Sequence, residues 1–424
     1  RQMCIRDRMK TYIFKHSLLG VIVGLSILGC TEGDKFDYNK NVAFITGTET
    51  TPVTKFVVED TPSSYAITAS TTDKVDKDVN VKFAIDRSLV ESYNQEHNTK
   101  YYAIPDGAAV LENADAVIQA GKAFSTPVTV KVTSTEDFAE GRVYVIPVTM
   151  TQVEGLDILK PSKTIFLQIS RVIHFTSLNI SNTNLYSNFI FSDDKKQELS
   201  NFTYEIKCYS QEWHRIARLC SFTSADEQRS SMLRFGENGL DINALQWVSP
   251  SGSIVSSTRF STDRWYMISL TYDGSKLTMY VDGVKDAQGD GDGKPVDFQR
   301  FELGMSWTGY RGSQYFRGRI AEVRVWNRAL STGELQMNLC GVDSQSEGLV
   351  AYWKMNEGEG HIFKDATGHG YDMDWTNTAR EINEGAGLTY NLNYSSAIAW
   401  DSDDNNRCND CLLYTSPSPR DVEE

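Results

Sequence analysis

Trp265-Tyr-Met-Ile-Ser-Leu-Thr-Tyr-Asp-Gly-Ser-Lys-Leu-Thr-Met-Tyr-Val-Asp-Gly283 reads as two β-strands joined by a tight turn. Residues 266–272 are mostly apolar or aromatic, and Asp273-Gly274 after them is the strongest short signal for a hairpin. Residues 277–281 alternate between apolar and more polar side chains, which predicts a strand with one buried face. Asp282-Gly283 ends that strand with a second turn. The stretch therefore predicts antiparallel strands.

A second block, Phe316-Arg-Gly-Arg-Ile-Ala-Glu-Val-Arg-Val-Trp-Asn-Arg-Ala-Leu-Ser331, follows further along the chain. Its apolar residues are Ile320, Val323 and Val325 with Trp326, and charged residues lie between them. This pattern predicts another strand that is buried on one side.

Both blocks resemble the laminin G-like, concanavalin-type jelly roll, whose pattern is W-x6-Y-D-G-x2-L-x-L-Y-V-D-G followed by F-x-G-x-I-x-E-V-R-I-W-N-R-A-L-S. Met279 and Val325 are mild departures from it. Residues 202–207 and 349–360 resemble an early strand and a late block of the same family. The resemblance implies a jelly-roll β-sandwich over residues 172–408. It implies little about function, because one fold hosts many activities.

Residues 41–171 predict a separate domain. Short strands are indicated at 55–58, 65–68, 79–85, 128–132, 143–150 and 164–169, with one amphipathic helix at 87–97. Many strands with one helical insert favour an immunoglobulin-like sandwich. The run Asp86-Arg-Ser-Leu-Val-Glu-Ser-Tyr-Asn-Gln-Glu-His-Asn-Thr-Lys-Tyr-Tyr-Ala-Ile-Pro-Asp-Gly-Ala-Ala-Val-Leu resembles the N-terminal domain of unknown function of Bacteroidetes surface lipoproteins. The expected fold class is therefore all-β, an Ig-like sandwich followed by a concanavalin-like jelly roll.

The ends of the chain carry processing signals. Residues 1–8 and 409–424 resemble non-native, adapter-derived extensions, the alternative for the tail being a genuine disordered segment. Residues 9–29 predict a signal peptide with a short apolar core. It ends in Ile27-Leu-Gly-Cys30, which resembles a bacterial lipobox and implies lipidation of Cys30; an ordinary secretory signal is the alternative. Residues 30–40 then form a tether, and the expected location is the outer membrane, lipid-anchored and exposed at the cell surface.

The charge balance and the cysteines limit the classes of function. A formal net charge of −14 argues against nucleic-acid binding, which needs clustered Lys and Arg. Four cysteines remain after Cys4, Cys30 and Cys411 are set aside. Disulfides 208–220 and 340–408 are plausible outside the cytoplasm, and free buried thiols are the alternative.

Aromatic side chains in connections between strands are the candidate ligand-binding residues. Sugar rings stack on aromatic faces, and their hydroxyls need polar partners. The segment 306–315 joins two strands and is rich in Gly and polar groups, so its aromatic residues are not needed for folding. The candidates are Trp307, Tyr310, Arg311, Tyr315, Trp213 (within Trp213-His214-Arg215) and Trp247. Most other aromatic residues, among them Trp265, Trp326 and Trp353, are expected in the core.

Four aspartates are candidate Ca2+ ligands, since hard cations prefer oxygen ligands. Asp286, Asp290 and Asp297 lie in a run whose spacing is similar to that of a calcium loop, although flanking helices are missing. A solvated acidic hairpin is the alternative. Asp365, in a turn near the C-terminus, is the fourth candidate.

Three readings of function follow. The first is a non-catalytic surface glycan-binding lipoprotein that captures oligosaccharides, host glycoprotein glycans among them, and passes them to glycosidases and an outer-membrane transporter. The second is a structural or adhesin protein whose jelly roll binds another protein. The third is a glycosidase of an unrecognised type. The paired-carboxylate motifs of known jelly-roll glycosidases are missing from the sequence, as are G-x-S-x-G, H-E-x-x-H and the P-loop.

Overall fold

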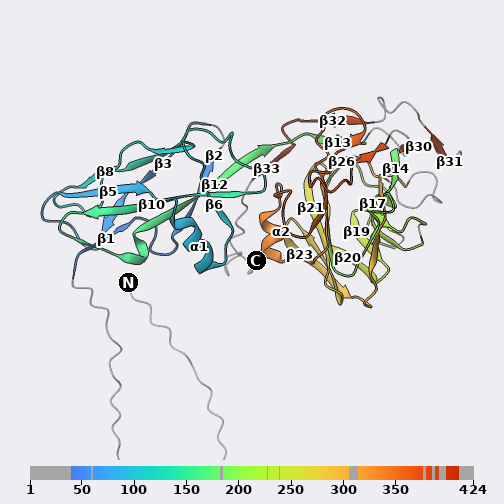
Figure 1. The fold of residues 1–424 in the computed structure, drawn as a ribbon, viewed down its shortest axis with the longest axis horizontal. Coiled ribbons are helices and arrows are strands. Elements are labelled where there is room, and N and C mark those ends of the chain that lie inside the picture. The colour runs from blue at the N-terminus through green and yellow to red at the C-terminus, as the bar shows by residue number, and fades with distance from the viewer. Residues whose placement is uncertain are drawn as a thin grey trace, which may run out of the picture. The chain divides into compact units, whose positions relative to one another are not determined.

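The computed structural model describes residues 40–58, 61–181, 185–226, 228–237, 239–304, 314–375, 379–383, 387–390 and 398–409. Across these residues strands dominate, and the helical elements are two α-helices and one 3-10 helix. Two β-sandwiches follow one another along the chain, which confirms the predicted all-β class (Figure 1). All of these elements belong to the unit Val42–Glu424.

The first sandwich contains one α-helix. Its elements are β1 (Val42–Ile45), β2 (Val53–Val58), β3 (Ser63–Ile67), β4 (Ala69–Thr71), β5 (Val79–Ile85), α1 (Leu89–His97), β6 (Tyr101–Ala103), β7 (Ala109–Leu111), β8 (Asp115–Ile118), β9 (Val128–Val132), β10 (Val143–Val153), β11 (Asp157–Ile158), the 3-10 helix η1 (Lys160–Ser162) and β12 (Thr164–His174).

These strands pair in three sheets, in the orders β11-β1-β4, β2-β12-β10-β5-β8 and β3-β9-β7, with β6 also paired to β10. The alternation in β5 sets the core face, because Val79, Val81 and Phe83 are buried. The predicted helix is confirmed as α1, and it packs through Val90 against Phe166 of β12.

The second sandwich contains the strands from β13 to β32 and a short helix. Its elements are β13 (Ser177–Asn179), β14 (Leu185–Ile190), β15 (Gln197–Leu199), β16 (Phe202–Ser210), β17 (Ala217–Thr223), β18 (Ser230–Phe235), β19 (Ala244–Ser249), β20 (Gly252–Arg259), β21 (Trp265–Tyr272), β22 (Lys276–Val281), β23 (Val284–Asp290), β24 (Val296–Phe298), β25 (Arg300–Leu303), β26 (Gly318–Trp326), α2 (Thr332–Met337), β27 (Leu349–Trp353), β28 (Ile362–Phe363), β29 (Met373–Asp374), β30 (Ala379–Asn383), β31 (Gly387–Tyr390) and β32 (Ala399–Asp401). The last strand, β33 (Arg407–Asn409), pairs with β12 of the first sandwich.

Two large sheets face each other across one core. One has the order β23-β22-β21-β16-β26-β13-β32, and the other has the order β20-β19-β18-β17-β25-β14-β30-β31. The hairpin predicted at Asp273-Gly274 joins β21 to β22, and Leu277 and Met279 of β22 are buried in the core. The second predicted block forms β26, which pairs with β16.

Two of the three tryptophans that were expected in the core are there. Trp326 is 1% exposed, and its indole N–H donates to Glu205 (2.9 Å). Trp353 is fully buried, and its indole N–H donates to the carbonyl oxygen of Tyr371 (2.8 Å). These two indoles combine burial with a satisfied hydrogen bond, as a structural role requires. Trp265, at the start of β21, is instead only partly buried.

The four cysteines of the described residues behave in two ways. Cys340 and Cys408 form a disulfide, whereas Cys208 and Cys220 are free and buried. One of the two plausible disulfides is therefore confirmed, and 208–220 is wrong. The two free thiols lie in the core cluster of the second sandwich.

The predicted boundary between residues 171 and 172 falls within β12. The last residues of this strand, Val172 to His174, pair with β33 near the other end of the chain. The domain division therefore stays a prediction. No helix among the described residues is long and apolar enough to cross a membrane.

Candidate functional site

The connection that carries most of the predicted ligand-binding residues starts and ends at one place on the second sandwich. Gly304, after β25, donates its N–H to the carbonyl oxygen of Leu219 in β17 (3.0 Å). At the other end, Phe316 donates its N–H to the carbonyl oxygen of Gly304 (2.9 Å), and Arg218 donates its N–H to the carbonyl oxygen of Gln314 (3.2 Å). Both ends of the connection are therefore anchored to the edge of β17. Trp307, Tyr310 and Arg311 lie outside the described residues, so their role stays a prediction.

Three half-buried rings gather at these ends, and we call Trp213, His214 and Tyr315 the aromatic rim. The Nε2 atom of His214 lies 2.7 Å from the carbonyl oxygen of Tyr315, and their ring centroids are 5.4 Å apart. Trp213 packs on the core residue Phe235 (4.5 Å), while its indole N–H is buried with no hydrogen-bond partner among the described residues. The structure thus brings two predicted segments together from distant parts of the chain.

Charged groups hold the Tyr315 ring in place. The guanidinium of Arg317 lies over this ring, 4.6 Å from its centroid, and donates to the phenol oxygen (2.8 Å). Arg317 also forms an ion pair with Glu212 (3.3 Å), the residue before Trp213. A ring fixed in this way presents its apolar surface at low entropic cost, as a stacking platform requires.

A row of polar side chains adjoins the rim on the sheet face opposite the core. We call Arg218, Arg234, Gln246 and Gln314 the polar strip. Arg234 alternates with buried residues along β18, and it lies directly opposite Arg218 in β17 and Gln246 in β19. Arg218 donates to the Gln314 amide oxygen (2.9 Å), and Arg234 donates to the Gln246 amide oxygen (3.0 Å).

Two arginines directly opposite each other are unfavourable for sheet stability, because like charges repel across a strand pair. Arg234 is offset by Glu237, which lies 2.7 Å from its Nε. Local conflicts of this kind are expected at functional sites. Sequence reasoning missed the polar strip, although the alternation of Arg234 with Leu233 and Phe235 was a signal for it.

Trp247 is not part of this surface, contrary to the sequence-based expectation. It is 1% exposed and points into the core, where it meets Phe202 edge to face (5.9 Å). Its indole N–H donates to the Ser231 hydroxyl (2.9 Å). Because Trp247 lies opposite the core residue Leu233, its ring faces away from the polar strip, and its role is structural.

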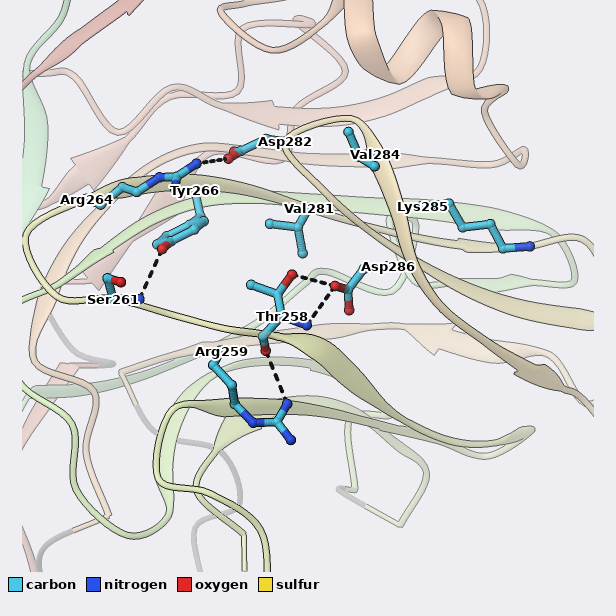
Figure 2. Close-up of a pocket in the computed structure, with 10 residues that line it drawn as sticks. All are labelled: Thr258, Arg259, Ser261, Arg264, Tyr266, Val281, Asp282, Val284, Lys285 and Asp286. Carbon is cyan, nitrogen blue, oxygen red and sulfur yellow. Dashed lines mark hydrogen bonds and ion pairs between the residues drawn. The ribbon is translucent and has the colours of Figure 1, made fainter. Parts of the chain in front are cut away.

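The candidate metal ligands are not brought together. Asp286 lines a cavity of about 310 Å3. Its carboxylate is turned toward Thr258 (Figure 2). It accepts hydrogen bonds from the N–H groups of Ser257 and Thr258 (both 2.8 Å), so it fastens β23 to β20. Arg264 and Asp282, at another side of the cavity, form an ion pair (3.0 Å).

The other three aspartates are each engaged by protein groups. Asp290 pairs with Lys276, and the buried Asp297 pairs with Arg229 (2.7 Å). Asp365 accepts the N–H groups of Tyr352 (3.1 Å) and Tyr371 (3.2 Å). Among the residues that the structure describes, no group of three or more His, Cys, Asp or Glu side chains is arranged to hold a metal ion. The candidate Ca2+ loop at 286–297 spans most of β23, a short connection and the start of β24.

Comparison with known families agrees with this geometry. A family model described as the Concanavalin A-like lectin/glucanases superfamily, of the laminin G type, matches residues 183–336. The matched residues lie in the second sandwich. A second family model, described as an N-terminal domain, matches residues 38–157. The concanavalin A-like match therefore covers the strands that carry the rim and the strip.

Solved structures also resemble the chain. A Bacteroides ovatus protein whose name proposes carbohydrate binding is 23% identical, with a TM-score of 0.55, over 83% of this chain and 100% of its own. A heptameric SAP-like pentraxin from Limulus polyphemus is 12% identical, with a TM-score of 0.33, over 51% of this chain and 96% of its own. EndoBT-3987 of Bacteroides thetaiotaomicron is 22% identical, with a TM-score of 0.24, over 28% of each chain. No curated protein matches. The first likeness shows a shared fold over most of the chain.

Proposed function

We propose that the protein is a non-catalytic, cell-surface glycan-binding lipoprotein. The observation that carries the proposal is the junction of the aromatic rim with the polar strip. Tyr315 and Gln314 are neighbours in the chain, and Gln314 is hydrogen-bonded to Arg218 through both its backbone and its side chain. The rim and the partly exposed side chains of the strip thus adjoin at one end of these strands, with the fully buried Arg218 behind them.

This combination suits an oligosaccharide. The C–H faces of pyranose rings pack on aromatic rings, and sugar hydroxyls accept from guanidinium groups and exchange hydrogen bonds with amides. Arg234 and Gln246 are only partly buried, so both present polar atoms to the surface. The predicted stacking residues Trp307, Tyr310 and Arg311 belong to the connection whose anchored ends border the strip. The carbohydrate-binding name of the Bacteroides ovatus relative supports the same reading.

We assign no catalytic step to the site. Glycoside hydrolysis uses two carboxyl groups that flank the scissile bond. The carboxylates beside the strip are held by cations instead: Glu237 pairs with Arg234 (2.7 Å), and Glu302 pairs with Arg300 (3.0 Å). These ion pairs favour binding over acid–base chemistry.

The setting completes the proposal. Lipidation of Cys30 would hold the protein at the outer membrane, with the N-terminal sandwich as a spacer. Captured oligosaccharide would then pass to an outer-membrane transporter and to glycosidases of the same system. The host-glycoprotein origin of the glycan is part of this proposal and rests on the surface location.

A glycan-array screen followed by affinity gels tests the binding role. Arg234→Gln removes one of the two positive charges of the strip, and Arg259→Gln is a matched control, because Arg259 pairs with Asp241 (2.6 Å), which is not a strip residue. We expect Arg234→Gln to weaken oligosaccharide retention and Arg259→Gln to leave it unchanged.

Two other outcomes would contradict the proposal. Retention of no glycan by the wild-type protein would favour the adhesin reading. Release of reducing ends from a bound oligosaccharide would show a glycosidase.

A further inference from the structure

A second cavity lies at the other end of β26 from the aromatic rim. Its volume is about 450 Å3, and its polar lining side chains are Asp194, Lys195, Gln197, Asn327, His369 and Tyr371. Tyr315 precedes β26 and Asn327 follows it, so the nine residues of the strand separate the two places by roughly 30 Å at ~3.3 Å per residue. The cavity is therefore distinct from the proposed site.

The lining is held by hydrogen bonds that come from three segments of the chain. The Gln197 amide donates to the Tyr371 phenol oxygen (2.5 Å), and that phenol donates to the carbonyl oxygen of Lys195 (2.9 Å). The Nδ1 atom of His369 lies 3.0 Å from the carbonyl oxygen of Val350. Because a carbonyl only accepts, Nδ1 carries a proton, and in the corresponding uncharged tautomer Nε2 is an acceptor. The lining is thus arranged before any ligand arrives.

The charges of the lining balance. Asp194 and Lys195 form a loose ion pair (3.6 Å) in which the Asp194 side chain is 71% exposed. The hydroxyl of Ser192 donates to Asp194 (2.7 Å) and lowers the pKa of this carboxyl, so it stays an acceptor at neutral pH. Together with the amides of Gln197 and Asn327, the cavity offers donors and acceptors without an excess of either charge.

Two glycines border the cavity in backbone conformations that L-residues rarely adopt. Gly348 has φ +82°, and a Cβ there would lie 3.0 Å from the Asn327 amide oxygen. Gly370 has φ +87°, and a Cβ there would lie 3.3 Å from the Lys195 side chain. A side chain at either position would press on a lining group, so these glycines keep the cavity shape.

We propose that this cavity binds a neutral sugar ring, as a second glycan contact beyond the rim and strip. Paired amides, a carboxylate and an imidazole acceptor match the alternating donor and acceptor character of sugar hydroxyls. A phosphate or sulfate group would need clustered cations, and the cavity lining holds one lysine that already has an acidic neighbour. A volume of about 450 Å3 lies in the range of small-molecule sites, which span roughly 300–1,000 Å3.

Two contacts on one domain would raise the retention of a long or branched glycan. Binding at one contact makes binding at the other intramolecular, so retention exceeds the affinity of either contact alone. The two contacts are independent, and the loss of one leaves the other in place.

Saturation-transfer NMR with free monosaccharides tests the second site in the full chain. The probes are glucose, galactose, mannose and N-acetylglucosamine, with glucuronic acid as a charged comparison. Asn327→Ala and His369→Ala alter the cavity, Tyr315→Ala alters the rim, and His361→Ala is a matched control, because His361 does not line the cavity. A thermal melt of each variant checks folding, and the exposed His369 gives a second reading if Asn327→Ala is unstable.

We expect at least one neutral monosaccharide to bind wild type, Tyr315→Ala and His361→Ala alike. Its Kd should rise about fivefold or more in each cavity variant, as the loss of one net hydrogen bond predicts. The proposal is overturned if no neutral sugar binds wild type, if glucuronic acid binds in preference, or if only Tyr315→Ala abolishes binding. The comparison of cavity and rim variants separates failure here from failure of the proposed function.

Discussion

The Nε2 atom of His214 lies 2.7 Å from the carbonyl oxygen of Tyr315, although 101 positions separate the two residues in the chain. Since a carbonyl only accepts, this nitrogen carries the proton. The contact joins the connection after β16 to the connection before β26. It turns two separate groups of aromatic residues into one surface, which is the basis of the proposed binding site.

Replacing Tyr315 with Ala should weaken oligosaccharide binding by roughly 2 kcal/mol, as expected for an aromatic anchor at a binding surface. The melting temperature should change little, because the ring is half-exposed. Tyr315→Phe is the control, since it keeps the stacking face and loses only the bond to Arg317 (2.8 Å). Titration calorimetry of wild type and both variants measures the oligosaccharide affinity of each. Equal affinity for the Ala and Phe variants and wild type would remove Tyr315 from the site.

Trp247→Ala and Trp307→Ala should behave in opposite ways. Trp247 is 1% exposed, so its truncation should cost about 3–5 kcal/mol of the free energy of unfolding. Trp307 is predicted to stack on a sugar ring, so its loss should lower affinity by roughly 1–3 kcal/mol and leave the melting temperature nearly unchanged. Denaturant unfolding and affinity gels measure the two effects. If Trp307→Ala loses stability but retains sugar as wild type does, Trp307 is a core residue and not a sugar contact.

Lys207 should make stability rise with pH in alkaline solution. Burial lowers the pKa of this lysine from 10.5 to about 8, while its ammonium donates to the carbonyl oxygen of Leu339 (2.9 Å). Between pH 8 and 10.5 the unfolded chain holds a proton that the folded chain has released, so the free energy of unfolding increases with pH. The full effect is at most roughly 3 kcal/mol.

The variant Lys207→Met should lack this increase, because it has no proton to release. Urea unfolding of both proteins from about pH 7 to about pH 10 measures the difference between them. A constant difference across this range would contradict the lowered pKa.

The disulfide between Cys340 and Cys408 should stabilise the fold, whereas the other two core thiols should be inert. It links residues 68 positions apart, and its removal in Cys340→Ser should cost roughly 2–4 kcal/mol of unfolding free energy. Burial raises the pKa of the Cys208 and Cys220 thiols, so both should resist alkylation in the folded protein. Denaturant unfolding measures the loss in Cys340→Ser, and peptide mass spectrometry after alkylation measures the accessibility of the two thiols. Modification of Cys220 before unfolding would show that the core opens.

Replacing Cys30 with Ala should release the protein from the membrane fraction. The resemblance to a lipobox predicts that lipidation of Cys30 anchors the protein, so the variant should appear in soluble form. Membrane fractionation followed by immunoblotting measures the distribution. A variant that still partitions with membranes would show that the lipidation hypothesis is wrong.

Local patterns in the sequence determined the strands, the turns and much of the core. The alternation of Leu277 and Met279 with more polar residues predicted that β22 has one buried face, and both side chains are buried. Asp273-Gly274 predicted the hairpin that joins β21 to β22. These signals are local, because side-chain alternation and turn chemistry act over a few residues. The all-β class and the concanavalin-type domain could therefore be predicted from the sequence alone.

Only the tertiary structure decided which side chains meet. A register shift between Arg218 and Cys220 sets Arg218 opposite Arg234, and sequence alone does not show such a shift. The same limit explains Trp247, whose aromatic character is equally suited to a core and to a sugar platform. Pairing across distant strands depends on register and packing over the whole sheet, so the rim, the strip and the second cavity emerged only from the folded chain.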